Sequence, residues 1–132
     1  MQAAWFEQFG PARDVLVVGE KPTPVPLAKI ARANELVEQG QEVVGVDRQA
    51  PPAGLPPELP AGITFLTADV TDAARMRELA AERPFSAVIH LAGLVTMACE
   101  QSPEAAMRVN VGGTANLLEA ARLAGIPTFV YA

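Results

Sequence analysis

The amino-acid sequence predicts an α/β fold: a Rossmann-like three-layer sandwich with about five parallel strands in the order 3-2-1-4-5. Short apolar runs alternate with segments of helical periodicity from residue 14 to residue 131. Strands and helices that alternate at this spacing form right-handed βαβ crossovers and a parallel sheet. The run 85–91 is almost entirely apolar, which is typical of a central parallel strand buried on both faces.

The first half of the chain is predicted to hold three strands and one helix. The strands are the β-branched, apolar segments 14–19, 42–46 and 63–66. Residues 27–39 carry an apolar face at helical spacing, and Gly40 suits the C-terminal cap of that helix. The proline- and glycine-rich stretch 50–62 is predicted to be a long surface connection.

The second half is predicted to hold two helices and two strands. Thr71 and Asp72 offer the start of a helix over 73–82, which is followed by the strand 85–91. Ser102 and Pro103 read as an N-cap and a first helical position, so that a long helix runs to about Ala124 and stops at Gly125. The last predicted strand is 126–131.

Length, charge and composition bound the class of protein. The 132 residues predict a single domain, 1–132, with residues 1–12 as an N-terminal extension of apolar character. No apolar run reaches the roughly 18 residues that cross a membrane, and the single cysteine, Cys99, is compatible with a reducing cytoplasm. A net charge of -5 without a basic stripe argues against nucleic acid as a partner. No residues show metal-ligand spacing, so no metal site is expected.

The turn after the first strand lacks the glycines of a dinucleotide-binding loop, which are spaced G-x-G-x-x-G or G-x-x-G-x-x-G. It reads Gly19-Glu20-Lys21-Pro22-Thr23-Pro24-Val25-Pro26. A pyrophosphate is held by free backbone N–H groups at a helix N-terminus, and prolines have none to offer. Glu20 adds negative charge at the same place. The cofactor is therefore unknown: NAD is possible, and the loop Gly19–Pro26 disfavours it.

Downstream segments resemble a known family. They are 38–47 (EQGQEVVGVD), 68–72 (ADVTD), 87–93 (AVIHLAG), 110–121 (NVGGTANLLEAA) and 129–132 (FVYA). In this order they resemble the N-terminal Rossmann half of the extended short-chain dehydrogenase/reductases, the NAD-dependent epimerase/dehydratase family, which acts largely on nucleotide sugars. The resemblance covers residues 14–132 except for the first loop and helix.

The resemblance implies cofactor-binding roles at the matching positions. Asp47 matches the acid that binds the adenosine ribose, which favours NAD over its 2′-phosphorylated form, and Gly19 is the one glycine left of the phosphate loop. Asp69 and Val70 match a pair beside the adenine. Leu91, Ala92 and Gly93 match the strand end that passes the cofactor, and Asn110 matches a helical asparagine near the active site.

Two departures from the family alter the functional prediction. The glycine loop is replaced, and the stretch from Gly19 to Gly40 is longer than usual. The family's Tyr-x-x-x-Lys pair is absent, because Tyr131 is the only tyrosine and both lysines, Lys21 and Lys29, precede it. The first hypothesis is therefore a truncated relative with weak or lost dinucleotide binding and no redox catalysis of the family type.

Two further hypotheses stay open. Carboxylates at the former cofactor mouth, Glu20 and Asp47, would be the catalytic pair of a small hydrolase acting on sugar-like, glycosidic substrates. Alternatively, the chain is an interaction module. The strand 126–131 would form an apolar sheet edge, which proteins usually cover, so a homodimer or larger homo-oligomer is predicted through this edge or the nearby long helix.

Three other residues are assigned structural roles. His90 lies inside an apolar run and is interpreted as a core or strand-end residue. Cys99 is placed in the loop before the long helix as an ordinary thiol. The pair Gly112 and Gly113 inside the long helix indicates close packing against a neighbouring element, because glycine otherwise weakens a helix.

Overall fold

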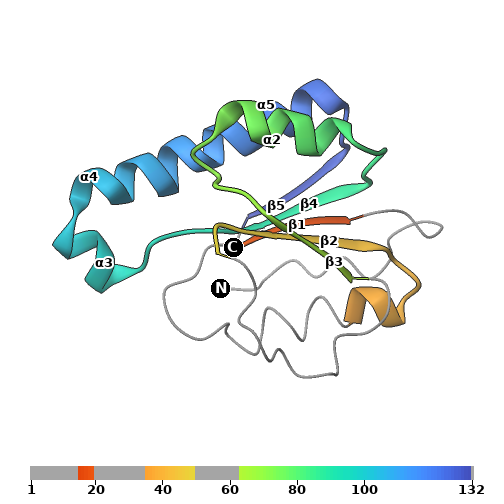
Figure 1. Ribbon diagram of the computed structural model, residues 1–132, viewed down its shortest axis with the longest axis horizontal. Helices are drawn as coiled ribbons and strands as arrows, with labels where there is room; N and C mark the ends of the chain where they lie inside the picture. The colour runs from red at the N-terminus through yellow and green to blue at the C-terminus, as the bar shows by residue number, and fades with distance from the viewer. Residues whose placement is uncertain (1–14, 20–34, 50–62, 132) are drawn as a thin grey trace.

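The computed structural model describes residues 15–19, 35–49 and 63–131 (Figure 1). Five parallel strands form one sheet in these ranges, in the order β3-β2-β1-β4-β5, which confirms the predicted topology. The strands are β1 (Val15–Gly19), β2 (Val43–Asp47), β3 (Ile63–Thr67), β4 (Ala87–Leu91) and β5 (Thr128–Tyr131). Their bounds differ from the predicted ones by one or two residues.

The register aligns the carboxyl ends of the central strands. Gly19, the last residue of β1, pairs with Leu91, the last residue of β4. On the other side of β1, Val18 pairs with Val46, one residue before Asp47. Since all pairings are parallel, the strand ends meet along one edge of the sheet, where folds of this type place their ligand sites.

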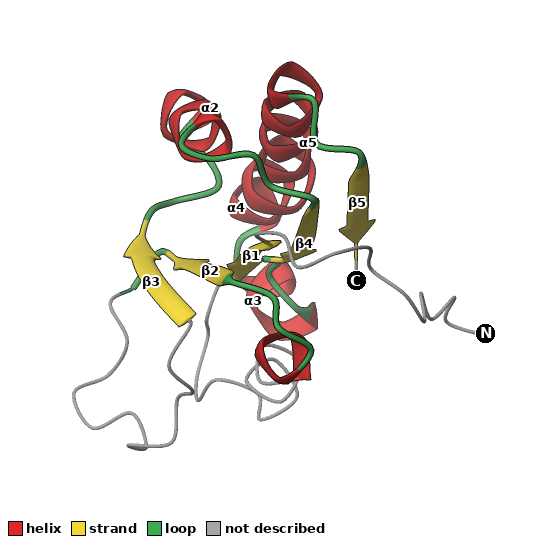
Figure 2. Ribbon diagram, turned by 90° about the vertical axis from the view of Figure 1, so that its right-hand side faces the viewer, coloured by secondary structure: helices red, strands yellow, loops and turns green. Residues whose placement is uncertain are grey.

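Side chains of alternating strand residues pack on opposite faces of the sheet. On one face, Val44 and Val88 join a core with helices α2 (Ala73–Ala81) and α5 (Thr114–Ala124). On the other face, Val43 and Ala87 pack with Leu36, from the helical stretch 35–38. Figures 1 and 2 show α2 and α5 together on one side of the strands, with the stretch 35–38 on the other. The described residues therefore form the predicted three layers.

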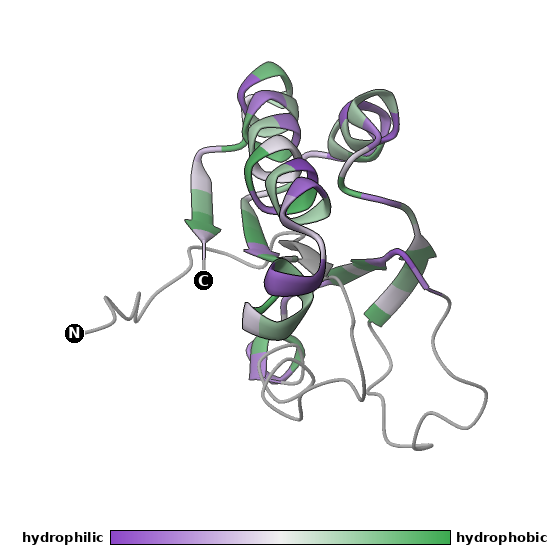
Figure 3. Ribbon diagram, turned by 90° about the vertical axis from the view of Figure 1, so that its left-hand side faces the viewer, coloured by the Kyte–Doolittle hydropathy of each residue, from purple (hydrophilic) through white to green (hydrophobic). Residues whose placement is uncertain are grey.

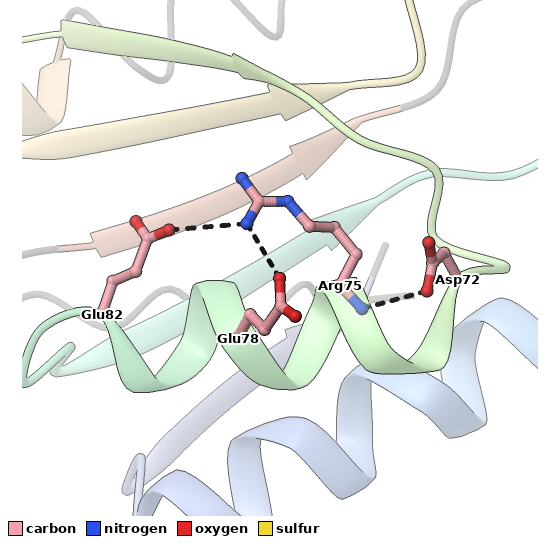
Figure 4. A network of polar contacts seen from close by, with 4 residues as sticks. All are labelled: Asp72, Arg75, Glu78 and Glu82. Carbon is pink, nitrogen blue, oxygen red and sulfur yellow. Dashed lines mark hydrogen bonds and ion pairs between the residues drawn. The ribbon is translucent and has the colours of Figure 1, made fainter.

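Helix α2 begins at a capping aspartate, as its sequence predicts. The Asp72 side chain accepts a hydrogen bond from the Arg75 amide at 3.0 Å. The Arg75 guanidinium then reaches Glu78 at 3.1 Å and Glu82 at 3.7 Å (Figure 4). Exposed ion pairs contribute little, typically less than about 1 kcal/mol. The cap and the buried face, which includes Met76 and Leu79, therefore decide where this helix forms.

The predicted long helix from Pro103 to Ala124 is present, and its middle is wider than an α-helix. It consists of α4 (Pro103–Ala106), the π-helical segment η1 (Met107–Gly113) and α5. Ser102 caps its start and Gly125, with φ of 69°, ends it in the left-handed conformation. The π-helical segment was not predicted, and such segments occur mostly at functional sites.

Two further helical features bear on the predictions. Cys99 lies in helix α3 (Thr96–Gln101) rather than in a loop, which corrects the prediction. Gly40 caps the stretch 35–38 as predicted, with φ of 79° and a hydrogen bond from its amide to the Val37 carbonyl. The predicted helix over 27–34, the extension 1–12, the loop 20–26 and the connection 50–62 lie outside the described residues. In the part that is described, no helix has the length and apolar character needed to span a membrane.

Candidate functional site

The structure brings most of the predicted site residues to one edge of the sheet. Gly19 ends β1, Asp47 ends β2, Asp69 follows β3 by two residues, and Leu91 ends β4. Glu20, the other half of the predicted hydrolytic pair, lies outside the described residues, so the pairing of Glu20 with Asp47 stays a prediction. The described edge therefore carries Asp47 at the end of β2 and Asp69 shortly after the end of β3, on the same side of the sheet as the ends of β1 and β4.

Asp47 is held by hydrogen bonds to both its backbone and its side chain. Its carbonyl oxygen accepts a hydrogen bond from the Ala68 amide at 2.9 Å, which extends the β2–β3 pairing past the end of β3. Its carboxylate Oδ1 accepts from the Gln49 amide at 2.9 Å. This local turn fixes the orientation of the carboxylate while the residue stays partly exposed.

Asp69 is held ionised by its neighbours. Its Oδ1 accepts hydrogen bonds from the Thr71 amide at 2.8 Å and the Thr71 hydroxyl at 2.7 Å. Burial opposes its ionisation, but the two bonds from Thr71 and the positive charges of Arg48 and Arg108 outweigh this effect and lower the pKa of Asp69. A carboxylate at this position therefore remains an acceptor across the physiological pH range.

Val70 serves the core rather than an open surface. Its side chain is 3% exposed and packs against Gly113 of η1, where an added Cβ would lie 2.6 Å from Val70 Cγ1. The Asn116 side chain donates from Nδ2 to the carbonyl oxygens of Val70 and Thr71 at 3.1 and 3.2 Å. The segment that carries Asp69 is thus anchored to the long helix through Val70 and Thr71.

Of the two adjacent glycines in the helix, only one is in close contact with a neighbouring element. Gly113 makes the close contact with Val70, whereas a Cβ on Gly112 would approach nothing nearer than the Met107 carbonyl oxygen at 3.9 Å. The prediction of close packing is confirmed for Gly113 and wrong for Gly112.

The segment after β4 is tied to the long helix by Asn110. The Leu94 amide donates to Asn110 Oδ1 at 2.7 Å, and Asn110 Nδ2 donates to the Leu94 carbonyl oxygen at 3.0 Å. The Cys99 thiol donates to the same carbonyl at 3.1 Å. Gly93 lies against this clamp, since a Cβ there would be 3.5 Å from Asn110 Oδ1. The predicted cofactor-side residues Leu91, Ala92 and Gly93 are therefore followed directly by Leu94, whose backbone is held by hydrogen bonds to Asn110 and Cys99.

His90 is a core residue, as predicted. It is fully buried, its Nε2 lies 2.8 Å from the Thr114 hydroxyl, and its ring packs edge-on to Phe129 and at a tilt to Tyr131 of β5. It is the residue before Leu91, the last residue of β4, and its side chain is buried.

Sequence reasoning missed two polar residues of the helix, Thr114 and Asn116. Both lie in the stretch 110–121 that carries the resemblance, and Thr114 follows Asn110 by four residues, a spacing that places two residues on the same side of a helix. That spacing was the available signal. Their partners, His90 and Val70, are 24 and 46 residues away in sequence, so the contacts themselves could not be read from the pattern.

The described edge holds the two acids that were predicted to lie at the adenosine end of a dinucleotide. Asp47 and Asp69 each carry a carboxylate oriented by a local hydrogen bond, at the end of β2 and after the end of β3. The turn at 19–26 has one glycine and three prolines, and a proline has no N–H group to donate to a pyrophosphate. Among the described residues, no three His, Cys, Asp or Glu side chains are grouped to hold a metal ion.

The strand order, the two acids at strand ends and the clamped segment after β4 define a protein of the Rossmann-like α/β class. The chain belongs to the NAD dependent epimerase/dehydratase family, whose profile matches residues 31–132. This match begins after the altered loop 19–26.

Individual relatives support the same assignment. An uncharacterized epimerase/dehydratase of Staphylococcus aureus (strain USA300) is 35% identical over 91 residues, which are 67% of this chain and 28% of the relative. The UDP-glucose 4-epimerase of Brucella ovis, solved with NAD, is 28% identical with a TM-score of 0.72, covering 91% of this chain and 35% of that one. The UDP-glucose-4-epimerase of Stenotrophomonas maltophila, solved with NAD and formylated UDP-arabinopyranose, is 26% identical with a TM-score of 0.71, covering 90% and 36%. The chain thus spans about a third of the length of these relatives.

Proposed function

We propose that these 132 residues form the Rossmann lobe of an epimerase/dehydratase-like protein, with weak or lost dinucleotide binding and no redox catalysis of the family type. The adenosine-end acids would give the lobe a residual affinity for the adenosine part of a nucleotide. Most of the affinity for a dinucleotide comes from its phosphates, and the altered loop would not supply that part.

The altered loop is the observation that carries this proposal. Residues 19–26 replace a glycine-rich turn by a segment with Glu20 and three prolines, at the point where β1 ends beside Leu91. The match to the family also begins only at residue 31. Since each proline removes one N–H donor and Glu20 repels a phosphate, this part of the site opposes dinucleotide binding.

Isothermal titration calorimetry with NAD+, NADP+ and ADP-ribose tests the proposal. We expect a Kd for NAD+ of about 1 mM or weaker, the range that corresponds to roughly 4 kcal/mol of binding free energy. Replacing Glu20, Pro22 and Pro24 together by glycine restores two N–H donors and removes one negative charge. This variant is expected to bind NAD+ about tenfold more tightly, a gain of about 1.4 kcal/mol.

The second proline-rich segment supplies a matched control. Replacing Pro56, Pro57 and Glu58 by glycine changes the same residue types in the other proline-rich segment of the sequence, 50–62, and it should leave the Kd unchanged. A micromolar Kd for NAD+ in the unmodified chain would refute the proposal. Equal gains in the two glycine variants would show that the effect is not specific to residues 19–26.

An oligomeric role is the second candidate, and it rests on the long helix. Its buried residues, Val109, Leu117 and Ala120, recur at helical spacing and face the sheet and α2. A second set, Met107, Val111 and Leu118, recurs at intervals of four and seven residues and is about half exposed or more. Figure 3 shows hydrophobic residues, in green, alternating with hydrophilic ones along this helix. A helix that is apolar on two sides is usually buried on both.

We therefore propose that a second copy of the chain covers this outer face, defined here by Met107, Val111 and Leu118. The face belongs to one helix, so a two-fold axis across it would bring the same three residues of both copies together. Tyr131 on the edge strand β5 is also exposed, and no described strand pairs with its outer side.

A further inference from the structure

We propose that Thr114 and His90 are positioning residues that, with Asn110, hold the strand-end segment Leu91–Gly93 in place. The segment is tied to the long helix at both of its ends. His90 immediately precedes it and is bonded to Thr114, while Leu94 immediately follows it and is bonded to Asn110. We call this arrangement the staple.

The Leu94 end of the staple is a paired contact between a side-chain amide and a backbone. Asn110 accepts from the Leu94 amide at 2.7 Å and donates to the Leu94 carbonyl at 3.0 Å. A carboxamide satisfies both groups of one residue at once, which fixes the position and the orientation of that residue. The contact spans 16 residues of sequence, so it depends on how the helix is placed.

The His90 end of the staple has a defined direction. The Thr114 hydroxyl donates to the Asn110 carbonyl oxygen at 2.6 Å. A hydroxyl has one proton to donate, so at the 2.8 Å contact His90 Nε2 must be the donor and Thr114 Oγ1 the acceptor. His90 therefore carries its proton on Nε2. The Thr114 hydroxyl thus links His90 of the sheet to the backbone carbonyl of Asn110.

The helix geometry links the two ends. Asn110 lies in the π-helical segment η1, and Thr114 is the first residue of α5. The Thr114–Asn110 bond therefore spans the junction where the helix changes its winding. A hydroxyl that bonds a carbonyl four residues back perturbs a helix locally. We infer that His90 and Thr114 fix the backbone geometry of this junction. That geometry orients the Asn110 side chain toward Leu94.

Removing the Thr114 hydroxyl should loosen the far end of the staple. Thr114→Val has nearly the same shape, but it leaves His90 Nε2–H without its acceptor and the Asn110 carbonyl without its donor. An unsatisfied buried donor is costly, so the junction will rearrange. The Asn110 clamp on Leu94 is then expected to open more often, although residue 114 does not touch Leu94.

Amide hydrogen exchange measured by NMR on the full chain tests this coupling. In Thr114→Val, we expect the Leu94 amide to exchange at least about tenfold faster than in the unmodified chain, after correction for the change at the core amides of Val88 and Leu117. The correction matters because a variant that only lowers global stability speeds the core amides by the same factor. Thr114→Ser keeps the hydroxyl and should restore the protection of Leu94.

Two outcomes would overturn the proposal: a Leu94 amide that follows the core amides in Thr114→Val, or a Thr114→Ser variant that behaves like Thr114→Val. If Thr114→Val fails to fold, Thr114→Ala supplies the same comparison with a smaller side chain. The readout needs no bound nucleotide. Failure of the NAD+ titrations and failure of the staple are therefore distinguishable.

Discussion

At the scale of single residues, the carboxylate of Asp69 is the group whose environment has the clearest consequence. Burial raises its pKa, but the hydrogen bonds from Thr71 and the charges of Arg48 and Arg108 together lower it by more, so the folded-state pKa lies below the ordinary value. The charged form is thus favoured by folding. By linkage, this stabilisation is present above the unfolded pKa of about 4 and is lost as the pH falls through the folded-state pKa.

Asp69→Asn should make stability less sensitive to acid. Between pH 5 and pH 3, the free energy of unfolding of the unmodified chain is expected to fall more steeply than that of the variant, because the variant has no carboxylate to protonate at this position. Urea denaturation at half-unit pH intervals measures both slopes. Parallel curves would show that the bonds from Thr71 do not favour the charged form.

At the scale of elements, the contact between η1 and the segment after β3 requires that residue 113 has no side chain. Gly113 lies so close to Val70 that a Cβ would stand 2.6 Å from Cγ1, whereas Gly112 has space. Valine has few alternative rotamers and Val70 is buried, so the neighbour cannot move aside without cost.

The two glycines therefore predict opposite effects of the same substitution. Gly113→Ala should lower the free energy of unfolding by about 1–3 kcal/mol through overpacking. Gly112→Ala should raise it by up to about 1 kcal/mol, because alanine is the better helix former. Urea denaturation of both variants decides between packing and helix propensity. If both are stabilised, the close approach of η1 to Val70 is not present in solution.

At the scale of the whole molecule, the proposal that a second copy covers the outer face of the long helix makes a prediction about the assembly state. Val111→Glu combined with Leu118→Glu places two charges where the second copy is proposed to dock. We expect the sedimentation coefficient to change from that of a dimer to that of a monomer, without loss of helical signal in circular dichroism. Desolvating a charge in such an interface is unfavourable.

A matched pair on α2 provides the control for that experiment. Ala74→Glu with Ala81→Glu adds the same charge at exposed positions of another helix and should leave the dimer intact. An unmodified chain that sediments as a monomer at micromolar concentration would contradict the proposed face.

The fold was predictable because its signals are local. Apolar, β-branched runs identify the strands. The caps at Asp72, Ser102 and Gly125 fall where the sequence places them. The parallel order follows from the alternation of strands and helices. Asp47, Asp69 and the segment 91–93 could likewise be assigned to one edge, since parallel strands end together.

The sequence by itself thus determined the class of fold, the family and the edge that carries the candidate site. Only the tertiary structure decided how that edge is held: the π-helical segment, the bonds of Thr114 and Asn116, and the difference between Gly112 and Gly113. The physical reason is that strand ends and caps depend on neighbours in sequence. Contacts such as His90 with Thr114 and Val70 with Gly113 depend on the rotation and position of a helix against a sheet, which no local pattern specifies.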